Sequence, residues 1–173
     1  MNNFKPIMYQ KSIFDINYAK LKKKNIEIIV MDLDNTIAKV DEIVPSDKVK
    51  DLFQKLAKDF KIVVASNNFK GRVKKMCENL PCDYFYRLFK PSKRLKKLLV
   101  ERYQIAMDNV CIIGDQIITD IYLGNKIGAL TILVDPIGEK DLKITSLNRF
   151  IEKKIKKKMK FKKGDYYEEG QIL

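Results

Sequence analysis

Continuous apolar runs of strand length alternate along the chain with segments of helical periodicity. Such runs, rather than alternating apolar and polar positions, are typical of parallel strands covered by helices on both faces. The pattern predicts an α/β protein with three layers, Rossmann-like, around a central and mostly parallel sheet. Strands are expected at residues 26–31, 61–66, 84–87, 110–114 and 130–134.

Four amphipathic segments between these strands predict the helices of the outer layers. Ser46 stands where an N-cap is expected, Pro91 falls in the first turn of the third helix, and Gly128 follows the fourth helix as a C-terminal cap. Strands and helices alternate from residue 26 to 134, so this stretch is expected to form the core of one domain. The helices are expected at residues 45–59, 70–80, 90–103 and 119–128.

Composition narrows the class of protein. The chain has 173 residues, 46% of them hydrophobic, and no apolar run reaches the roughly 18 residues needed to span a bilayer. The first residues lack the apolar core of a secretory signal, so we expect a cytoplasmic protein. The absence of histidine excludes Ser-His-Asp, Cys-His and HExxH chemistry. An enzyme with this composition would use carboxylates, lysines, hydroxyls or a hard metal ion.

Positive charge is concentrated near the C-terminus. The chain holds 35 basic and 22 acidic residues, for a net charge of +13, and residues 149–163 alone contain nine basic residues and one Glu. We therefore distinguish a domain at residues 1–148 from a basic C-terminal helix and tail at residues 149–173.

Polar residues follow the predicted strands at the points where they end. Because parallel strands end at one edge of the sheet, these residues are expected to converge there. Neighbouring acids, a hydroxyl and a lysine suit a Mg²⁺-dependent phosphoryl-transfer site, in which carboxylates bind the cation and the other groups bind phosphate oxygens. The residues concerned are Asp32, Asp34, Thr36, Ser66, Asn67, Lys90, Asp115 and Asp120.

These stretches resemble the four motifs of the haloacid dehalogenase-like (HAD) hydrolases. The family's motifs are an hhhDxDx[TV] loop, a strand-ending Ser or Thr, a Lys, and a GDxxx(x)D loop. The corresponding stretches are "IVMDLDNT", "VVASNN", "KP" at residues 90–91 and "IIGDQIITD", in the same order. A DxDxT motif alone arises often by chance, whereas four motifs in order are specific. The resemblance implies a HAD fold.

The resemblance also implies the central roles. Asp32 would be the nucleophile that forms an aspartyl phosphate, and Asp34 would be the general acid and base. Mg²⁺ would be held by the Asp32 carboxylate, the Asp34 backbone carbonyl and Asp115.

The other residues would support or bind the substrate. Thr36 would support the first loop beside the substrate, and Ser66, with Asn67 nearby, would bind the phosphoryl group. Lys90 would clamp the phosphate and neutralise the nucleophile. Asp120 would orient Lys90 or a metal-bound water rather than bind the metal directly.

Ordinary structural roles remain open for several of these residues. Asp32 and Asp34 taken alone would fit a polar turn, and residues 66–68 would fit a polar loop. Lys90 is one of many lysines and fits a surface position, and Asp120 fits the acidic start of a helix.

The spacing of the motifs leaves no room for a cap domain. Asp32 and Ser66 are 34 residues apart, and Ser66 and Lys90 are 24 apart, intervals that one helix and its connections fill. Without a cap the site cannot enclose a small substrate. We therefore expect a large one, such as a protein, a nucleic-acid end or a lipid headgroup.

The basic C-terminal segment favours a membrane partner. Leu147, Ile151, Ile155 and Met159 recur every four residues among lysines, a pattern that suits an anionic membrane surface. The alternatives are a helix docked on the sheet with a solvated lysine face, and a patch that binds RNA phosphates.

A fuller likeness, over nearly the whole chain, is to the YqeG-type subgroup of uncapped, subfamily IIIA HAD phosphatases. It is carried by "SIFDINYAKLKKKNIEIIVMDLDNT", "SNN", "KP", "GDQIITDIYLGNKIGALTILV" and "NRFIEKKI". That subgroup is related to phosphatidylglycerophosphate phosphatases. The resemblance implies a Mg²⁺-dependent phosphomonoesterase acting on phosphatidylglycerophosphate, peripheral on the inner membrane face. A HAD phosphatase of nucleotides or nucleic-acid ends, and a basic RNA- or ribosome-binding protein with a vestigial site, are the alternatives.

Overall fold

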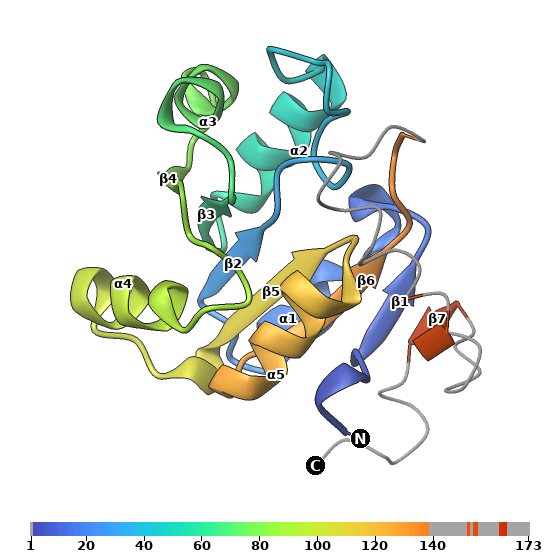
Figure 1. Cartoon of the computed structure of the whole chain (residues 1–173). Helices are drawn as coiled ribbons and strands as arrows, with labels where there is room; N and C mark the ends of the chain where they lie inside the picture. The colour runs from blue at the N-terminus through green and yellow to red at the C-terminus, as the bar shows by residue number, and fades with distance from the viewer. Residues whose placement is uncertain (1, 139–151, 153, 156–162, 166–173) are drawn as a thin grey trace.

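A twisted sheet forms the centre of the molecule in the computed structural model, which describes residues 2–138, 152, 154–155 and 163–165 (Figure 1). The described strands follow the order β4-β3-β2-β5-β6-β1-β7. β1 to β6 are parallel, and β7 pairs antiparallel with β1. The strands are β1 Met8–Gln10, β2 Ile28–Met31, β3 Lys61–Ala65, β4 Asp83–Phe85, β5 Val110–Gly114, β6 Leu130–Val134 and β7 Gly164–Asp165.

β2 lies between β3 and β5 and sets the register of both. Ile28 pairs with Lys61 on one side and with Val110 on the other. The chain passes from β2 to β3 in one direction and later returns to β5 on the opposite side, so the order of strands reverses beside β2. In open parallel sheets, ligands bind at the carboxyl ends of the strands beside such a reversal.

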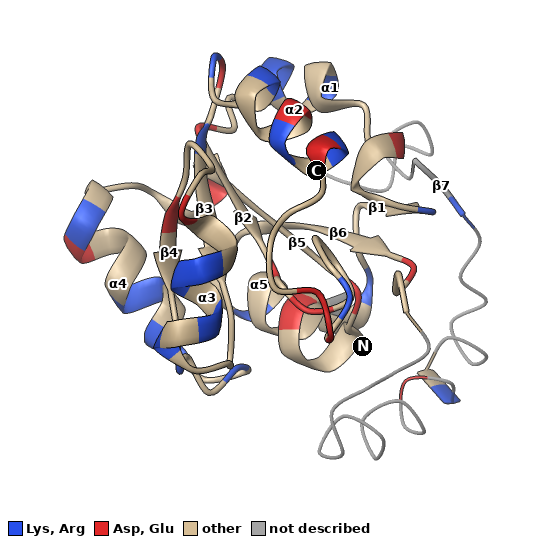
Figure 2. Cartoon of the chain, turned by 90° about the horizontal axis from the view of Figure 1, so that it is seen from above, with Lys and Arg blue, Asp and Glu red and all other residues tan. Residues whose placement is uncertain are grey.

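Helices cover both faces of this sheet. α1 and α2 bury Leu21 and Phe53 in the larger apolar cluster, whereas α4 and α5 bury Leu99 and Leu123 in a second cluster. The sheet separates α1 and α2 from α5 in the view of Figure 2. The helices are α1 Tyr18–Lys23, α2 Asp47–Leu56, α3 Lys70–Cys77, α4 Arg94–Tyr103 and α5 Leu123–Ile127, with 3₁₀ turns at Asn2–Phe4, Ile13–Asp15 and Met107–Asn109 and a π-helical segment, η4, at Ile117–Tyr122.

The three-layer α/β class and the mostly parallel sheet are confirmed. β5 and β6 have the predicted bounds, and β2, β3, β4, α2 and α3 differ from prediction by one to three residues at their ends. α2 fills the interval between β2 and β3, and α3 and β4 fill the interval from β3 to Lys90. No cap domain is inserted in this continuously described stretch.

The first strand and the first helix are absent from the elements predicted from the sequence. β1 has three residues and α1 has six, which is too short for a clear periodicity. β1 nevertheless extends the sheet beyond β6, with Met8 paired to Ile132. Leu21 of α1 is completely buried.

Two predicted helix starts are wrong. α4 begins at Arg94, so Pro91 precedes the helix instead of lying in its first turn, and the peptide bond before Pro91 is cis. The chain first turns the side chain of Lys90 into the interior and only then starts the helix. The last predicted helix begins at residue 117, as η4, and the expected cap at Gly128 is present with a φ of 89°.

Part of the basic C-terminal segment is described, and it contacts the body of the protein. Glu152 is buried and accepts a hydrogen bond from the amide of Ile118 (3.2 Å), and Ile155 packs against the apolar cluster that contains Ile117 and Ile121. The rest of the predicted C-terminal helix, with most of its apolar stripe, lies outside the described residues. Among the described helices, none is both long enough and apolar enough to cross a membrane.

Ser46 provides a test of how α2 begins. Its hydroxyl accepts a hydrogen bond from the Val49 amide (3.4 Å). Ser46→Ala should lower the free energy of unfolding by about 1 kcal/mol, because the Val49 amide loses its side-chain acceptor and keeps only the Ser46 carbonyl (3.0 Å). Urea denaturation measures the change, with Lys48→Ala at an exposed position of the same helix as control. Equal losses in the two variants would argue against the cap.

Candidate active site

The carboxyl ends of β2, β3 and β5 bring together residues predicted to form one site. Asp32 follows β2, Ser66 follows β3 and Asp115 follows β5. The Asp32 amide donates to the carbonyl of Ile113 (2.9 Å), which ties the end of β2 to that of β5. Asp32, Ser66 and Asp115 are all buried. The predicted convergence of these side chains at one sheet edge is therefore present.

Lys90 enters the site from the loop after β4. Its ammonium group lies 2.5 Å from Asp32 Oδ1 and 2.7 Å from Asp120 Oδ1, and it donates to the Ala65 carbonyl at 3.0 Å. These three acceptors match the three N–H bonds of an ammonium group. Because the residue is only 8% exposed, the surface position that the sequence left open for Lys90 is excluded.

Asn67 fixes the backbone of Lys90. Its side-chain oxygen accepts from the Lys90 amide (2.6 Å), and its side-chain nitrogen donates to the Lys90 carbonyl (3.3 Å). The sequence predicts that Asn67 lies near the phosphoryl group, and the structure adds this direct link to the lysine. These two hydrogen bonds fix the position of the Lys90 backbone, from which the side chain extends into the site.

Asp120 fits into the site because residue 114 has no side chain. A Cβ atom built on Gly114 would lie 2.3 Å from Cγ of Asp120. The second carboxylate oxygen of Asp120 accepts from the Gln116 amide (3.3 Å) and from the Thr119 hydroxyl (3.2 Å). Both oxygens of Asp120 therefore have protein donors. This explains in physical terms why a glycine ends β5.

Three buried carboxylates are close enough to share a cation. Oxygens of Asp32, Asp115 and Asp120 lie within 4.8 Å of one another. The Thr36 hydroxyl donates to Asp115 Oδ1 (3.1 Å), which holds that carboxylate in place. Carboxylate oxygens are hard ligands of the kind that Mg²⁺ prefers. The donor set at this edge of the sheet thus fits a Mg²⁺ ion.

Burial and charge perturb the ionisation of the site. Burial raises the pKa of Asp32 well above its ordinary value; Lys90 opposes this rise, and Asp120 and Asp115 add to it. Burial lowers the pKa of Lys90, but the Asp120 and Asp32 carboxylates outweigh burial, so the pKa of Lys90 is raised. The lysine therefore remains protonated, and a bound divalent cation would favour the ionised form of Asp32.

Asp34 faces a different set of partners. Its Oδ1 accepts from Nη2 (2.5 Å) and Nε (2.9 Å) of Arg72, and its Oδ2 accepts from the Asn68 side chain (3.0 Å). Arg72 also donates to the carbonyls of Glu42 (2.7 Å) and Lys39 (3.1 Å). The guanidinium group thus joins α3, the β2–α2 loop and the second aspartate of the DxD motif.

Arg72 contacts Asp34 but is not among the residues predicted from the sequence to form the site. It lies in the α3 sequence "KGRVKKMC", in which every other basic residue is a lysine. The single arginine is the only feature of the sequence that sets residue 72 apart. A guanidinium group holds its N–H groups in a rigid planar fork, a geometry that a lysine ammonium group does not have. An arginine at this position can be interpreted as a partner of a carboxylate only after the structure shows that it lies beside Asp34.

Ser66 takes part in the turn after β3. Its hydroxyl oxygen accepts from the Asn68 amide (3.0 Å), and its own amide donates to the Phe85 carbonyl (3.0 Å). Asn68 in turn contacts Asp34. The turn therefore connects the strand-ending serine to the first motif as well as to Lys90.

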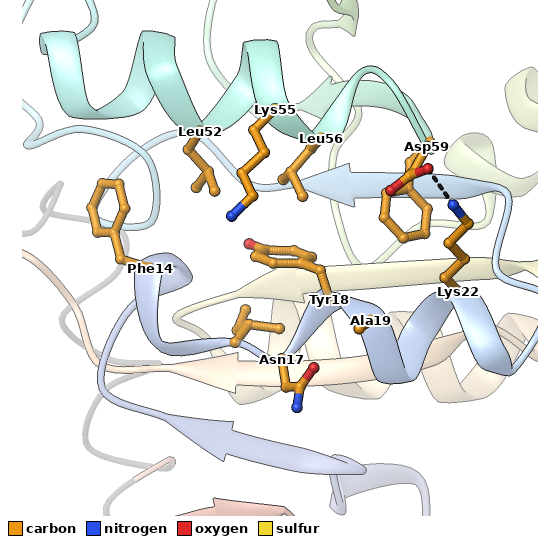
Figure 3. Close-up of a pocket in the computed structure, with 11 residues that line it drawn as sticks. Phe14, Asn17, Tyr18, Ala19, Lys22, Leu52, Lys55, Leu56 and Asp59 are labelled. Atoms are coloured by element: carbon orange, nitrogen blue, oxygen red, sulfur yellow. Dashed lines mark hydrogen bonds and ion pairs between the residues drawn. The ribbon is translucent and has the colours of Figure 1, made fainter.

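A cavity of about 560 Å³ lies elsewhere, between α1 and α2 (Figure 3). Tyr18 and Leu52 line it, and the ion pair between Lys22 and Asp59 lies at one end. None of the predicted site residues lines this cavity. It is separate from the acidic cluster at the strand ends.

The family model for haloacid dehalogenase-like hydrolases matches residues 5–128, which include the four motifs. The chain belongs to this family, as the motifs predicted. The match and the buried acidic cluster together support Mg²⁺ as the cofactor.

One relative in sequence and two solved structures are similar to this chain over most of its length. It is 34% identical over 167 residues to a Bacillus subtilis (strain 168) protein named "Probable phosphatase YqeG", covering 96% of this chain and 97% of the relative. An uncharacterized protein from Listeria monocytogenes serotype 4b has a TM-score of 0.54 and 15% identity, with 67% of this chain and 84% of that chain covered. The cobalt-bound deoxy-D-mannose-octulosonate 8-phosphate phosphatase (YrbI) from Haemophilus influenzae has a TM-score of 0.50 and 14% identity, with 79% and 90% covered. The two structures support the fold, and the relative supports a HAD-type phosphatase.

The charge balance of the site can be tested without substrate. Lys90→Met should lower the free energy of unfolding by about 3 kcal/mol, because it leaves buried carboxylates without their counter-charge. Mg²⁺ should restore part of this loss, since a bound cation replaces the missing positive charge. The measurement is urea denaturation in EDTA and in Mg²⁺, with Lys93→Met at an exposed position as control. A loss in the control as large as that in Lys90→Met would refute this role.

Proposed function

We propose that the protein is a Mg²⁺-dependent phosphomonoesterase that works through an aspartyl phosphate and removes the terminal phosphate of phosphatidylglycerophosphate. The observation that carries the chemistry is the contact of the buried Lys90 ammonium with Asp32. A carboxylate that attacks an anionic phosphate ester needs positive charge beside it. Lys90 supplies a fixed charge of this kind.

In the first step, Asp32 attacks the phosphorus atom and Asp34 protonates the leaving oxygen. A bond forms between phosphorus and an Asp32 carboxylate oxygen, and the ester bond to the alcohol breaks. In the second step, Asp34 accepts a proton from water as the water oxygen attacks phosphorus. Inorganic phosphate leaves, and the Asp32 carboxylate is restored.

The surrounding residues hold the reacting groups. Lys90 and Ser66 bind phosphoryl oxygens, Thr36 supports the first loop, and Asn67 keeps the lysine in place. Asp120 acts through Lys90, because both of its oxygens already accept from protein donors. Bound by the Asp32 and Asp115 carboxylates and the Asp34 carbonyl, Mg²⁺ would offset repulsion between the acids and the phosphate.

The choice of a lipid phosphate is supported by the absence of a cap between β2 and Lys90. A substrate whose phosphate projects from a membrane surface could reach such a site without being enclosed. The relation of the YqeG-type subgroup to phosphatidylglycerophosphate phosphatases points the same way. We propose that residues 1–148 act as one catalytic domain at the inner membrane face and that residues 149–173 add attraction to anionic lipid.

Phosphate release tests the reaction and the substrate together. With Mg²⁺, the wild type should hydrolyse phosphatidylglycerophosphate in micelles with a higher kcat/KM than p-nitrophenyl phosphate or 5′-nucleotides. Asp32→Asn should reduce turnover roughly 10⁴-fold, because the nucleophile is lost. Asp51→Asn, the same chemical change at an exposed position of α2, is the control. If the wild type hydrolyses none of these substrates, the proposed phosphatase activity is excluded. If it hydrolyses only the soluble esters, the lipid substrate is excluded.

Arg72 should matter for turnover more than for stability. Arg72→Ala should lower kcat about 10²-fold, because Asp34 loses the group that orients it for proton transfer. Arg72→Lys should recover little of this loss, since an ammonium group lacks the rigid planar fork of N–H groups. Steady-state kinetics with p-nitrophenyl phosphate measures both variants, with Lys74→Ala on the same helix as control. Wild-type kcat in Arg72→Ala would show that this ion pair does not orient Asp34.

A further inference from the structure

Exposed apolar side chains gather on the loops that surround the candidate active site. They are 41–67% exposed and belong to the loops after β2, β3, β4 and β6, whose carboxyl ends share the sheet edge that carries Asp32. Of the large hydrophobic residues exposed in the described part of the chain, only Phe14 and Val100 are not in this group. The group, called the mouth surface below, consists of Ile43, Val44, Phe69, Phe89 and Ile137.

Hydrogen bonds tie the loops of the mouth surface to the site residues. The Phe69 amide donates to the Asn68 side chain (2.9 Å), which also contacts Asp34. The Ile137 amide donates to the Asn35 carbonyl (2.9 Å), within the DxD loop. Phe89 directly precedes Lys90. The loops that carry Phe69, Phe89 and Ile137 are therefore attached directly to residues of the candidate site.

The segment from Arg87 to Lys90 alternates between outside and inside. Arg87 and Phe89 are exposed, whereas Leu88 and Lys90 are buried. Arg87 and Phe89 both have left-handed backbones, with φ of 49° and 54°, which are unfavourable for non-glycine residues. The chain thus adopts a costly conformation that leaves a phenylalanine ring in solvent next to the site lysine. Such outliers are concentrated at sites that bind or act on ligands.

Positive charge surrounds the two phenylalanines. Residues 66–97 contain ten basic and two acidic residues, and basic segments of α3 and α4 are visible in Figure 2. The Arg87 guanidinium lies 4.9 Å from the centre of the Phe69 ring. The loop that carries Ile43 and Val44 also contains the acidic residues Asp41 and Glu42. Attraction to anions is therefore expected from the loops that carry Phe69 and Phe89.

We propose that the mouth surface is an interfacial binding surface that inserts its apolar side chains into a bilayer carrying anionic phospholipids. Isolated apolar tips on several loops, with cations beside them, suit insertion among lipid headgroups. Ile43, Val44 and Ile137 are aliphatic and offer no ring for stacking on a nucleic-acid base. Ile155, from the apolar stripe of the basic tail, packs against the body instead. This inference rests on the proposed lipid substrate and assigns the contact to the catalytic domain itself.

The absence of tryptophan from the chain allows a direct test. Phe89→Trp in the full chain provides a single fluorophore at the mouth surface, and Val100→Trp provides one at an exposed position of α4. Mixing with vesicles of phosphatidylcholine and phosphatidylserine in equal parts should shift the Phe89→Trp emission to the blue and leave Val100→Trp unchanged. Vesicles that sediment with the protein but cause no shift in Phe89→Trp would overturn the proposal. A shift with RNA but not with vesicles would also overturn it.

Removal of the apolar rings provides the second measurement. Phe69→Ser combined with Phe89→Asn should weaken binding to the same vesicles about tenfold or more, because two rings no longer enter the lipid. Asn tolerates the left-handed backbone of residue 89, so the variant is expected to fold. Val100→Ser is the control, and equal binding by the double variant and the wild type would overturn the proposal. Both measurements record binding without turnover, so they can succeed or fail independently of the phosphatase reaction.

Discussion

The buried contact of one ammonium group with two carboxylates is the constraint on which the site depends. Lys90 binds Asp32 and Asp120, and each of these charges would be costly to bury without the others. Several features of the fold serve this contact. The chain turns inward at Lys90 before α4 begins, Asn67 fixes the Lys90 backbone, and Gly114 leaves space for Asp120. The geometry of three separate loops is therefore set by one arrangement of charge.

The central strands and the acidic residues that follow them could be predicted from the sequence. β5 and β6 are long, apolar and β-branched, so their bounds could be predicted without error, and Asp115 followed at the expected position. Asp32, Ser66 and Lys90 could be predicted to converge because parallel strands end at a common edge. The direction of each strand is enough to predict this convergence, and the alternation of strands and helices indicates that direction.

What could not be predicted depends on contacts between distant segments. The bonds from Arg72 to Asp34 and to the β2–α2 loop follow from how α3 packs, and the single arginine among the lysines of α3 does not by itself identify these partners. The start of α4 is determined by the burial of Lys90 rather than by the helix-favouring Pro91. β1 is three residues long and is stabilised by pairing with β6, a partner that no local pattern identifies.

The pairing of β1 with β6 has a consequence for how the chain folds during synthesis. Met8 lies opposite Ile132, so β1 meets this partner only after more than a hundred further residues have been made. β2, β3 and β5 can pair with one another before that point. The acidic site can then form on this partial sheet while β1 is still unpaired. β6 later pairs with both β1 and β5 and so connects β1 to the other strands. β1 therefore joins the sheet later than β2, β3 and β5, although it precedes them in the chain.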